Sequence, residues 1–153
     1  MIRTTHLSRL LCLSLALLRP CPALAQDAPY LAVVDRFFEL VQDGETDDAV
    51  AFLYSSNPWM ARSADAVEQV RSRLGDLPGV VGQLRHRELL QRKELGTRFV
   101  YLSYLAAYDR QPIRFIFEFY KADEAWMTFG FSFDQDLDDD VEGRARQELG
   151  SPP

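Results

Sequence analysis

The residues of this chain best suited to acid–base chemistry are one glutamate within an aromatic run and two tyrosines just before it. Glu118 lies in the stretch FIFEFYKADEAWMTFGFSFD, residues 115–134, which holds six phenylalanines. Tyr104 and Tyr108 precede this stretch. A carboxylate could abstract a proton beside a carbonyl, and a hydroxyl could donate a hydrogen bond to the resulting enolate oxygen. Such a site requires the three side chains to point into one apolar cavity.

The alternation of side chains along residues 115–134 predicts that Glu118 points away from such a cavity. Alternate positions in both arms of this stretch are aromatic, and the positions between them are mixed. Directly opposite residues of an antiparallel pair share a face, so the phenylalanine rows must match. A three-residue loop at 122–124 achieves this match. It pairs Lys121 with Ala125, Tyr120 with Trp126, Phe119 with Met127, Phe117 with Phe129 and Phe115 with Phe131.

The preceding hairpin extends the same aromatic face. A two-residue loop at Arg110-Gln111 places Tyr104 opposite Phe117, and Ser103 opposite Glu118. The row predicted to face the interior then contains no acid: Leu102, Tyr104, Tyr108, Phe115, Phe117, Phe119, Phe129, Phe131 and Phe133. The tyrosines could donate hydrogen bonds, but the base is missing, so we predict no catalytic residue. Candidates for lining a ligand pocket are Tyr104, Tyr108, Phe117 and, from the loop Asn57-Pro58-Trp59-Met60, Trp59.

Glu118 is predicted to share the outer face of the sheet with Arg114, Tyr120, Trp126 and Thr128. A face rich in Tyr and Trp with few charges is typical of protein interfaces. We expect a homodimer contact there. Two alternatives stay open: a partner protein, or a covering segment of the same chain.

No pattern in the sequence predicts a metal or cofactor. His86 is the single histidine after residue 25, and Arg85 and Arg87 flank it. The acidic run DQDLDDDVE, residues 134–142, lacks the Gly at position 6 and the Glu at position 12 that an EF-hand loop needs. This run is better explained as the acidic first turn of a helix over residues 138–149.

The first 25 residues have the form of a secretory signal peptide. Arg3 and Arg9 precede the apolar run LLCLSLALL, and Ala23-Leu24-Ala25 forms a cleavage signal. We therefore expect a secreted or periplasmic protein that begins at Gln26. Without residues 1–25 the chain has no cysteine and a formal charge of −9. That charge argues against nucleic acid and anionic membranes as partners.

The rest of the chain divides into a helical half and a strand half. Spacing of apolar residues predicts helices over 29–42, from about 46 to 54, and over 63–74, with a loop at Gly75–Gly82. Strands are predicted over 98–108, 113–121 and 125–134. Residues 84–95 could be helix or strand, and strand is favoured. This order predicts one α+β domain over 26–137, followed by an acidic helix and a disordered end over 138–153.

Two segments carry a resemblance to a known superfamily. The opening LAVVDRFFELVQDGETDDAVAFL and the ending IRFIFEFYKADEAWMTFGFSFD are similar to NTF2-like, SnoaL-like domains, a cystatin-like α+β cone. The resemblance implies a curved four-stranded antiparallel sheet around helices, a pocket at the open end and frequent homodimers. It implies no activity, because the superfamily includes enzymes and non-catalytic modules. We expect a non-catalytic domain that binds a small apolar ligand or an envelope protein. The alternative is an enzyme resembling ketosteroid isomerases, with a carboxylate and Tyr in the cone.

Overall fold

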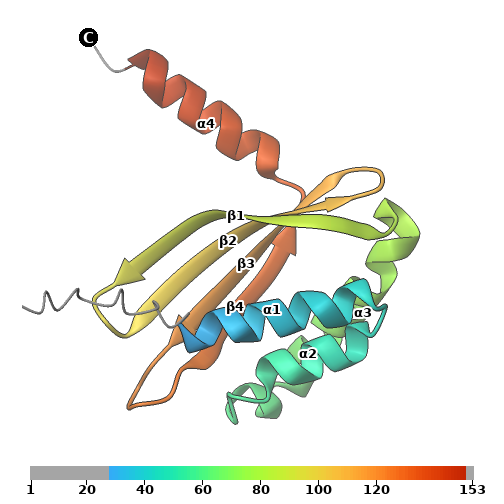
Figure 1. Cartoon of the computed structure of the whole chain (residues 1–153), viewed down its shortest axis with the longest axis vertical. Helices are drawn as coiled ribbons and strands as arrows, with labels where there is room; N and C mark the ends of the chain where they lie inside the picture. The colour runs from blue at the N-terminus through green and yellow to red at the C-terminus, as the bar shows by residue number, and fades with distance from the viewer. Residues whose placement is uncertain (1–27, 151–153) are drawn as a thin grey trace, which may run out of the picture.

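The computed structural model describes residues 28–150 and shows helices packed against one antiparallel sheet (Figure 1). Four strands follow one another in the order β1-β2-β3-β4. The elements are α1 (Pro29–Gln42), α2 (Thr46–Tyr54), the 3-10 turn η1 (Met60–Arg62), α3 (Ala64–Val81), β1 (Leu84–Leu95), β2 (Phe99–Tyr108), β3 (Pro112–Tyr120), β4 (Met127–Asp134) and α4 (Leu137–Gly150). The predicted α+β class is confirmed, and residues 84–95 form a strand.

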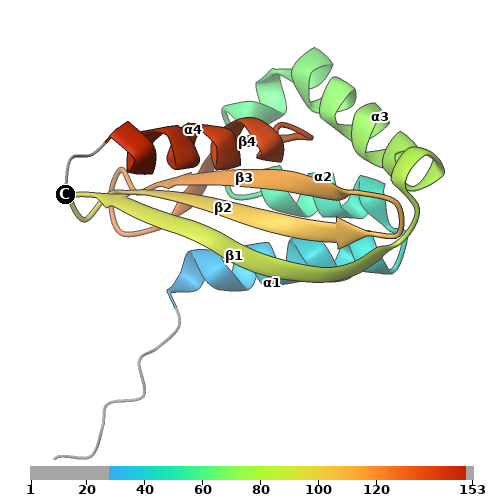
Figure 2. The same ribbon diagram turned by 90° about the horizontal axis from the view of Figure 1, so that it is seen from above.

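The predicted signal peptide and the last three residues lie outside the described range. Within the described part of the chain, no helix has the length and apolarity needed to cross a membrane. Helix α4 follows β4 and lies on the opposite side of the sheet from α1 (Figure 2). It runs away from the sheet, so most of that outer face is left open (Figure 1).

Helix α1 supplies the centre of the core. Pro29 suits the first turn of a helix, where its missing N–H costs nothing. The apolar stripe of α1 places Phe37 and Phe38 against the sheet, and both are buried. Their rings lie 5.3 and 5.6 Å from the ring of Phe117. Edge-on aromatic contacts of this kind add to the free energy gained by burying the rings.

Helix α3 is longer than predicted. The expected loop from Gly75 to Gly82 is helical as far as Val81, even though Pro78 lies inside it. Leu74, Leu77 and Val81 are buried on one face, which stabilises the extra turns. The prediction was wrong because tertiary burial outweighs the low helix propensity of Gly and Pro.

The β3–β4 register differs from the predicted one. Phe117 pairs with Phe131, Phe115 pairs with Phe133, and Phe119 pairs with Thr128. Between Glu118 and Phe119 the register shifts, so Phe129 has no partner and forms a β-bulge. A bulge adds one residue and exchanges the faces of the residues beyond it.

Because of the bulge, the predicted positions of two residues are wrong. Phe129, predicted to face the interior, is 55% exposed. Thr128, predicted on the outer face, is fully buried. The Thr128 hydroxyl donates a 2.7 Å hydrogen bond to the carbonyl of Leu53 in α2. Its backbone carbonyl accepts a bond of the same length from the Asn57 side chain. These bonds to the end of α2 and to the loop after it hold Thr128 inward.

The β2–β3 register is also shifted from the prediction, by two residues. Tyr104 pairs with Phe115 instead of Phe117, and Glu118 pairs with Tyr101 instead of Ser103. A shift of two leaves every side chain on its predicted face. The rows predicted for β2 and β3 are therefore on the correct sides, although their cross-strand neighbours are different.

Candidate functional site

The interior of the sheet is filled by aromatic rings. Phe117 is fully buried, and its ring contacts those of Phe37, Phe38, Tyr104 and Phe131. Tyr104 is also buried, with its ring 5.5 Å from that of Phe38. These two pocket candidates are therefore part of the packed core. The rings of α1 fill the space where the resemblance implied a pocket.

The other two pocket candidates lie apart from each other. The Tyr108 hydroxyl is buried and has no hydrogen-bond partner in the described part of the chain. Burial raises the pKa of Tyr108, so this hydroxyl keeps its proton. Trp59 is 66% exposed, and the Arg62 guanidinium lies 4.7 Å from the centre of its ring. The structure does not bring the four candidates together.

Among the side chains that the structure describes, no carboxylate is buried, and the buried polar residues are Asn57, Ser103 and Thr128. Asp109, next to Tyr108, lies at the surface. The hydrogen bond from Arg85, at 2.6 Å, lowers the pKa of Asp109, and a bond from the backbone N–H of Gln83 adds to this. Asp109 therefore stays ionised and holds β1 to the end of β2. It does not act as a base directed into the core.

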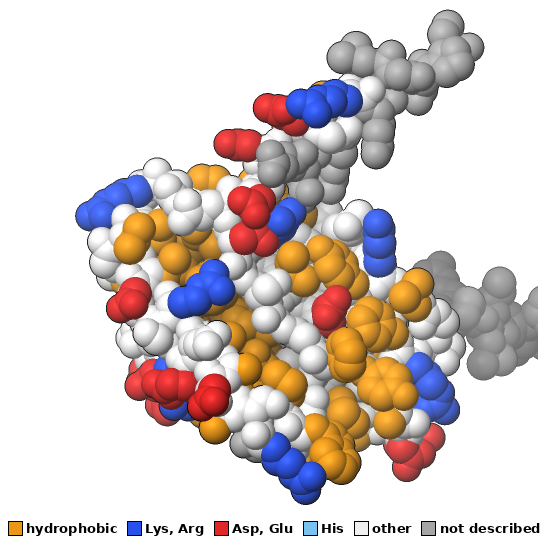
Figure 3. All heavy atoms as spheres, turned by 180° about the vertical axis from the view of Figure 1, so that it is seen from behind, with side chains coloured by type: hydrophobic (Ala, Val, Ile, Leu, Met, Phe, Trp, Pro, Cys, Tyr) orange, Lys and Arg blue, Asp and Glu red, His pale blue; other side chains and the backbone are white. Residues whose placement is uncertain are grey.

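The outer face of the sheet carries a group of large apolar side chains. Phe99, Tyr120 and Phe129 form a cluster, defined here as the outer aromatic cluster. The ring of Phe129 lies 5.8 Å from that of Phe99 and 6.3 Å from that of Tyr120. Figure 3 shows apolar side chains gathered over the strands, with charged side chains mainly around them. Exposed aromatic patches of this kind are typical of interaction surfaces.

Glu118 lies beside the outer aromatic cluster. Its cross-strand neighbours are Tyr101 and Gly130, and its side chain is half-buried. A Cβ added at Gly130 would collide with the Glu118 carboxylate, which therefore lies across the backbone of β4. Among the described residues, this carboxylate has no hydrogen-bond or ion-pair partner. Glu118 is on the outer face, as predicted.

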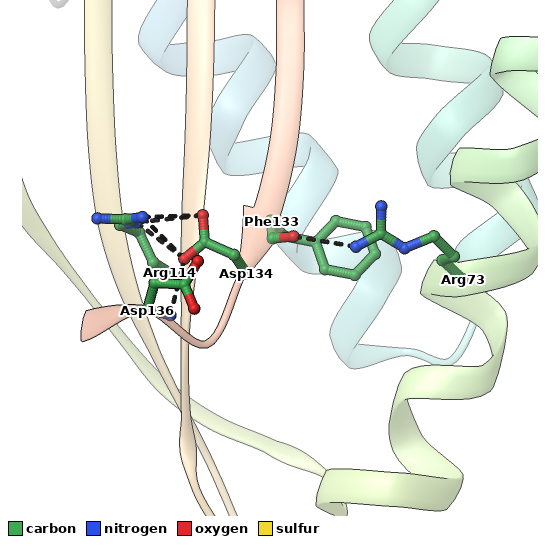
Figure 4. Close-up of polar contacts among 5 residues, drawn as sticks. All are labelled: Arg73, Arg114, Phe133, Asp134 and Asp136. Carbon is green, nitrogen blue, oxygen red and sulfur yellow. Dashed lines mark hydrogen bonds and ion pairs between the residues drawn. The ribbon is translucent and has the colours of Figure 1, made fainter. Parts of the chain in front are cut away.

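Arg114, also on the outer face, is paired with Asp134. Two hydrogen bonds of 3.0 Å join its guanidinium to the two carboxylate oxygens (Figure 4). The Arg114 side chain is only 14% exposed, so the pair is well shielded from water. Bidentate pairing of this kind fixes the geometry of both side chains. The pair joins β3 to the end of β4.

Trp126 lies on the side of the sheet that faces α1, and not on the predicted outer face. Its ring centre is 5.1 Å from that of Tyr30 in α1, and it packs against the core. The predicted pairing of Tyr120 with Trp126 is wrong, because Tyr120 pairs with Met127. The loop between β3 and β4 is thus longer than the predicted three residues, and Trp126 lies within it.

A groove of about 230 Å³ lies between α3 and the end of β4. The Arg73 guanidinium is 4.8 Å from the ring centre of Phe133 and donates a 3.3 Å hydrogen bond to its carbonyl (Figure 4). Leu77 and Ile113 contribute apolar walls. The contacts of Arg73 with Phe133 join α3 to β4 across this groove.

The sequence interpretation missed Phe99 and Phe129 as surface residues, and it did not single out Lys93. Lys93 is exposed on β1 and pairs with Tyr101. Only the cross-strand rows place these residues near Glu118. Within the described residues, no group of three or more His, Cys, Asp or Glu side chains could hold a metal ion.

Comparisons with known proteins give one structural likeness to report. No protein-family model matches the chain. No curated protein matches it. It is similar to a crystal structure described as an NTF2-like transpeptidase from Campylobacter jejuni, with 11% identity and a TM-score of 0.49. The match covers 66% of this chain and 97% of that one. At this level of identity the likeness concerns the fold and gives no information on activity.

Proposed function

We propose that this chain is an exported, non-catalytic interaction domain that forms a homodimer through the outer face of its sheet. The observation that carries the proposal is the outer aromatic cluster, exposed on the face opposite α1. Tyr and Phe side chains supply large contact areas at interfaces. The face carries charges of both signs: Lys93 and Glu118 lie in one cross-strand row, and the Arg114–Asp134 pair lies further along β3. It is therefore suited to contact a copy of itself.

The core supports the proposed absence of catalysis. Proton abstraction of the ketosteroid isomerase type needs a carboxylate base beside a hydroxyl donor in a cavity. The aromatic rings around Phe117 occupy that space, and the buried hydroxyl of Tyr108 has no hydrogen-bond partner among the described residues. A filled interior also favours a protein partner over a small apolar ligand.

A charged residue in place of Phe129 should abolish the dimer. We expect Phe129→Lys to be monomeric, with the dissociation constant of the dimer raised at least about 100-fold, because the charge would be desolvated within the interface. Sedimentation equilibrium measures this constant. Val80→Lys is the matched control, since Val80 is 61% exposed but lies on α3. If the wild-type chain is monomeric at high concentration, or if both variants dimerise equally, the proposal is wrong.

The export part of the proposal rests on residues 1–25 and has its own test. Mass spectrometry of the protein from its bacterial host should find a chain that begins at Gln26, in the periplasm or the medium. An intact N-terminus on cytoplasmic protein would contradict export. Such a result would not affect the proposed dimer.

A further inference from the structure

Two charged residues of opposite sign lie on one cross-strand row of the outer face. Lys93 of β1 pairs with Tyr101 of β2, Tyr101 pairs with Glu118 of β3, and Glu118 pairs with Gly130 of β4. Directly opposite residues share a face, so the side chains of Lys93, Tyr101 and Glu118 all project outward. Tyr101 separates the cation from the anion.

These two charges are unpaired within the described chain. The α-carbons of Lys93 and Glu118 are two strand spacings apart, about 10 Å, and the Glu118 carboxylate leans further away, over Gly130. A direct contact across the face of Tyr101 is therefore not formed. Both charges face the side where a partner would dock. The partner should therefore place an anion opposite Lys93 and a cation opposite Glu118.

We propose that a second copy of the chain docks about a two-fold axis that runs parallel to the strands over Tyr101. This inference rests on the proposed function, because it assumes that the outer face is the dimer interface. Rotation about that axis brings Lys93 of each copy over Glu118 of the other. Two equivalent ion pairs then flank a contact between the two Tyr101 rings. The flexible lysine side chain spans the remaining distance to the carboxylate.

The rest of the face agrees with this axis. Phe99, which is also on β2, meets its own copy, and Tyr120 on β3 faces β1 of the partner, so these two members of the outer aromatic cluster are covered. An axis over β3 would instead face Glu118 with the partner's Glu118. Two like charges so placed would oppose association. Isologous contacts of this type require a self-complementary patch, and the axis over β2 supplies it.

Charge-reversal variants of the full chain test the position of the axis. Lys93→Glu and Glu118→Lys each place two like-charged pairs in the interface. We expect each to raise the dissociation constant of the dimer by about 10- to 100-fold at low salt. The double variant Lys93→Glu/Glu118→Lys restores both pairs with reversed polarity and should dimerise like the wild type.

Mixing the two single variants is the decisive measurement. In a heterodimer of Lys93→Glu with Glu118→Lys, one copy carries two acids and the other carries two lysines. Each contact then pairs an acid with a lysine, so both contacts are attractive. Native mass spectrometry of the equimolar mixture should therefore show heterodimers, while each variant alone is monomeric. Far-ultraviolet circular dichroism of each variant checks that it is folded.

The outcomes separate this inference from the proposed function. If Phe129→Lys abolishes the dimer but the charge variants dimerise normally, the outer face is the interface and the axis is wrong. If the mixture stays monomeric, the axis is also wrong. If the wild type is monomeric, the proposed function itself fails.

Chemical cross-linking gives a second, independent measurement. In a background with Cys12 and Cys21 replaced by serine, Tyr101→Cys lies on the axis and should be joined to its own copy by a short bismaleimide. Ser132→Cys on β4 is the control, because the axis places it about 20 Å from its copy. Equal cross-linking at both positions would overturn the axis.

Discussion

Phe117→Ala should destabilise the folded chain by about 3–5 kcal/mol. Phe117 is fully buried and contacts four aromatic rings, so its truncation removes a large apolar area and leaves a cavity that α1 cannot fill. This loss is a large part of the 5–15 kcal/mol that stabilises a typical domain. Urea unfolding, followed by circular dichroism, measures the change in the free energy of unfolding.

Phe129→Ala is the matched control for Phe117→Ala. The sequence alternation placed both residues on the inner face, but the bulge exposes Phe129. We expect its truncation to cost less than about 1 kcal/mol at protein concentrations too low for dimers. Equal destabilisation by the two variants would show that Phe129 faces the core and that the bulge is absent.

Gly82→Ala should cost about 2–4 kcal/mol in the free energy of unfolding. Gly82 ends α3 with a φ of 89° and a ψ of −159°, a conformation that side chains with a Cβ rarely adopt. A Cβ there would also lie 2.5 Å from the Cβ of Asp109. Moving Asp109 away would weaken its hydrogen bonds to Gln83 and Arg85.

Gly79→Ala, three residues earlier, should have the opposite effect. Gly79 is helical, and a Cβ added to it meets nothing within 4 Å. Alanine is the better helix former and also restricts the unfolded chain, so we expect a gain of about 0.5–1 kcal/mol. Thermal unfolding of both variants provides the comparison. A stable Gly82→Ala variant would contradict the close approach of Asp109.

The helical stripe of α1 and the alternation in β2 and β3 could be predicted from the sequence. In each segment, apolar residues recur with the period of a helix or of a strand, and this spacing depends only on neighbouring residues. Phe37 and Phe38 recur on one helix face, and Phe115 and Phe117 on one strand face. The extent of α3 was not readable, since Gly75 and Pro78 favour a turn locally. Burial of Leu77 and Val81 by the rest of the chain reverses that preference.

The candidate site was only partly predictable for a related reason. Glu118 and Tyr120 were placed on the outer face because β3 is regular. Trp126 and Thr128 were misplaced because they lie at or beyond the irregular end of the hairpin. The alternation itself gives no signal for a bulge, but the isolated glycine next to Phe129, Gly130, is a known mark of one and was not used.

The sequence by itself indicated three of the four strands and the buried faces of β2 and β3, while it left residues 84–95 open between helix and strand. It could not choose the register, because a shift of two residues keeps every side chain on the same face. Only the tertiary structure fixed the bulge, through the bonds from Thr128 to Leu53 and Asn57, which are more than 70 residues away in the chain. Those distant contacts turn Phe129 outward, and the settled register brings Lys93, Tyr101 and Glu118 into one row.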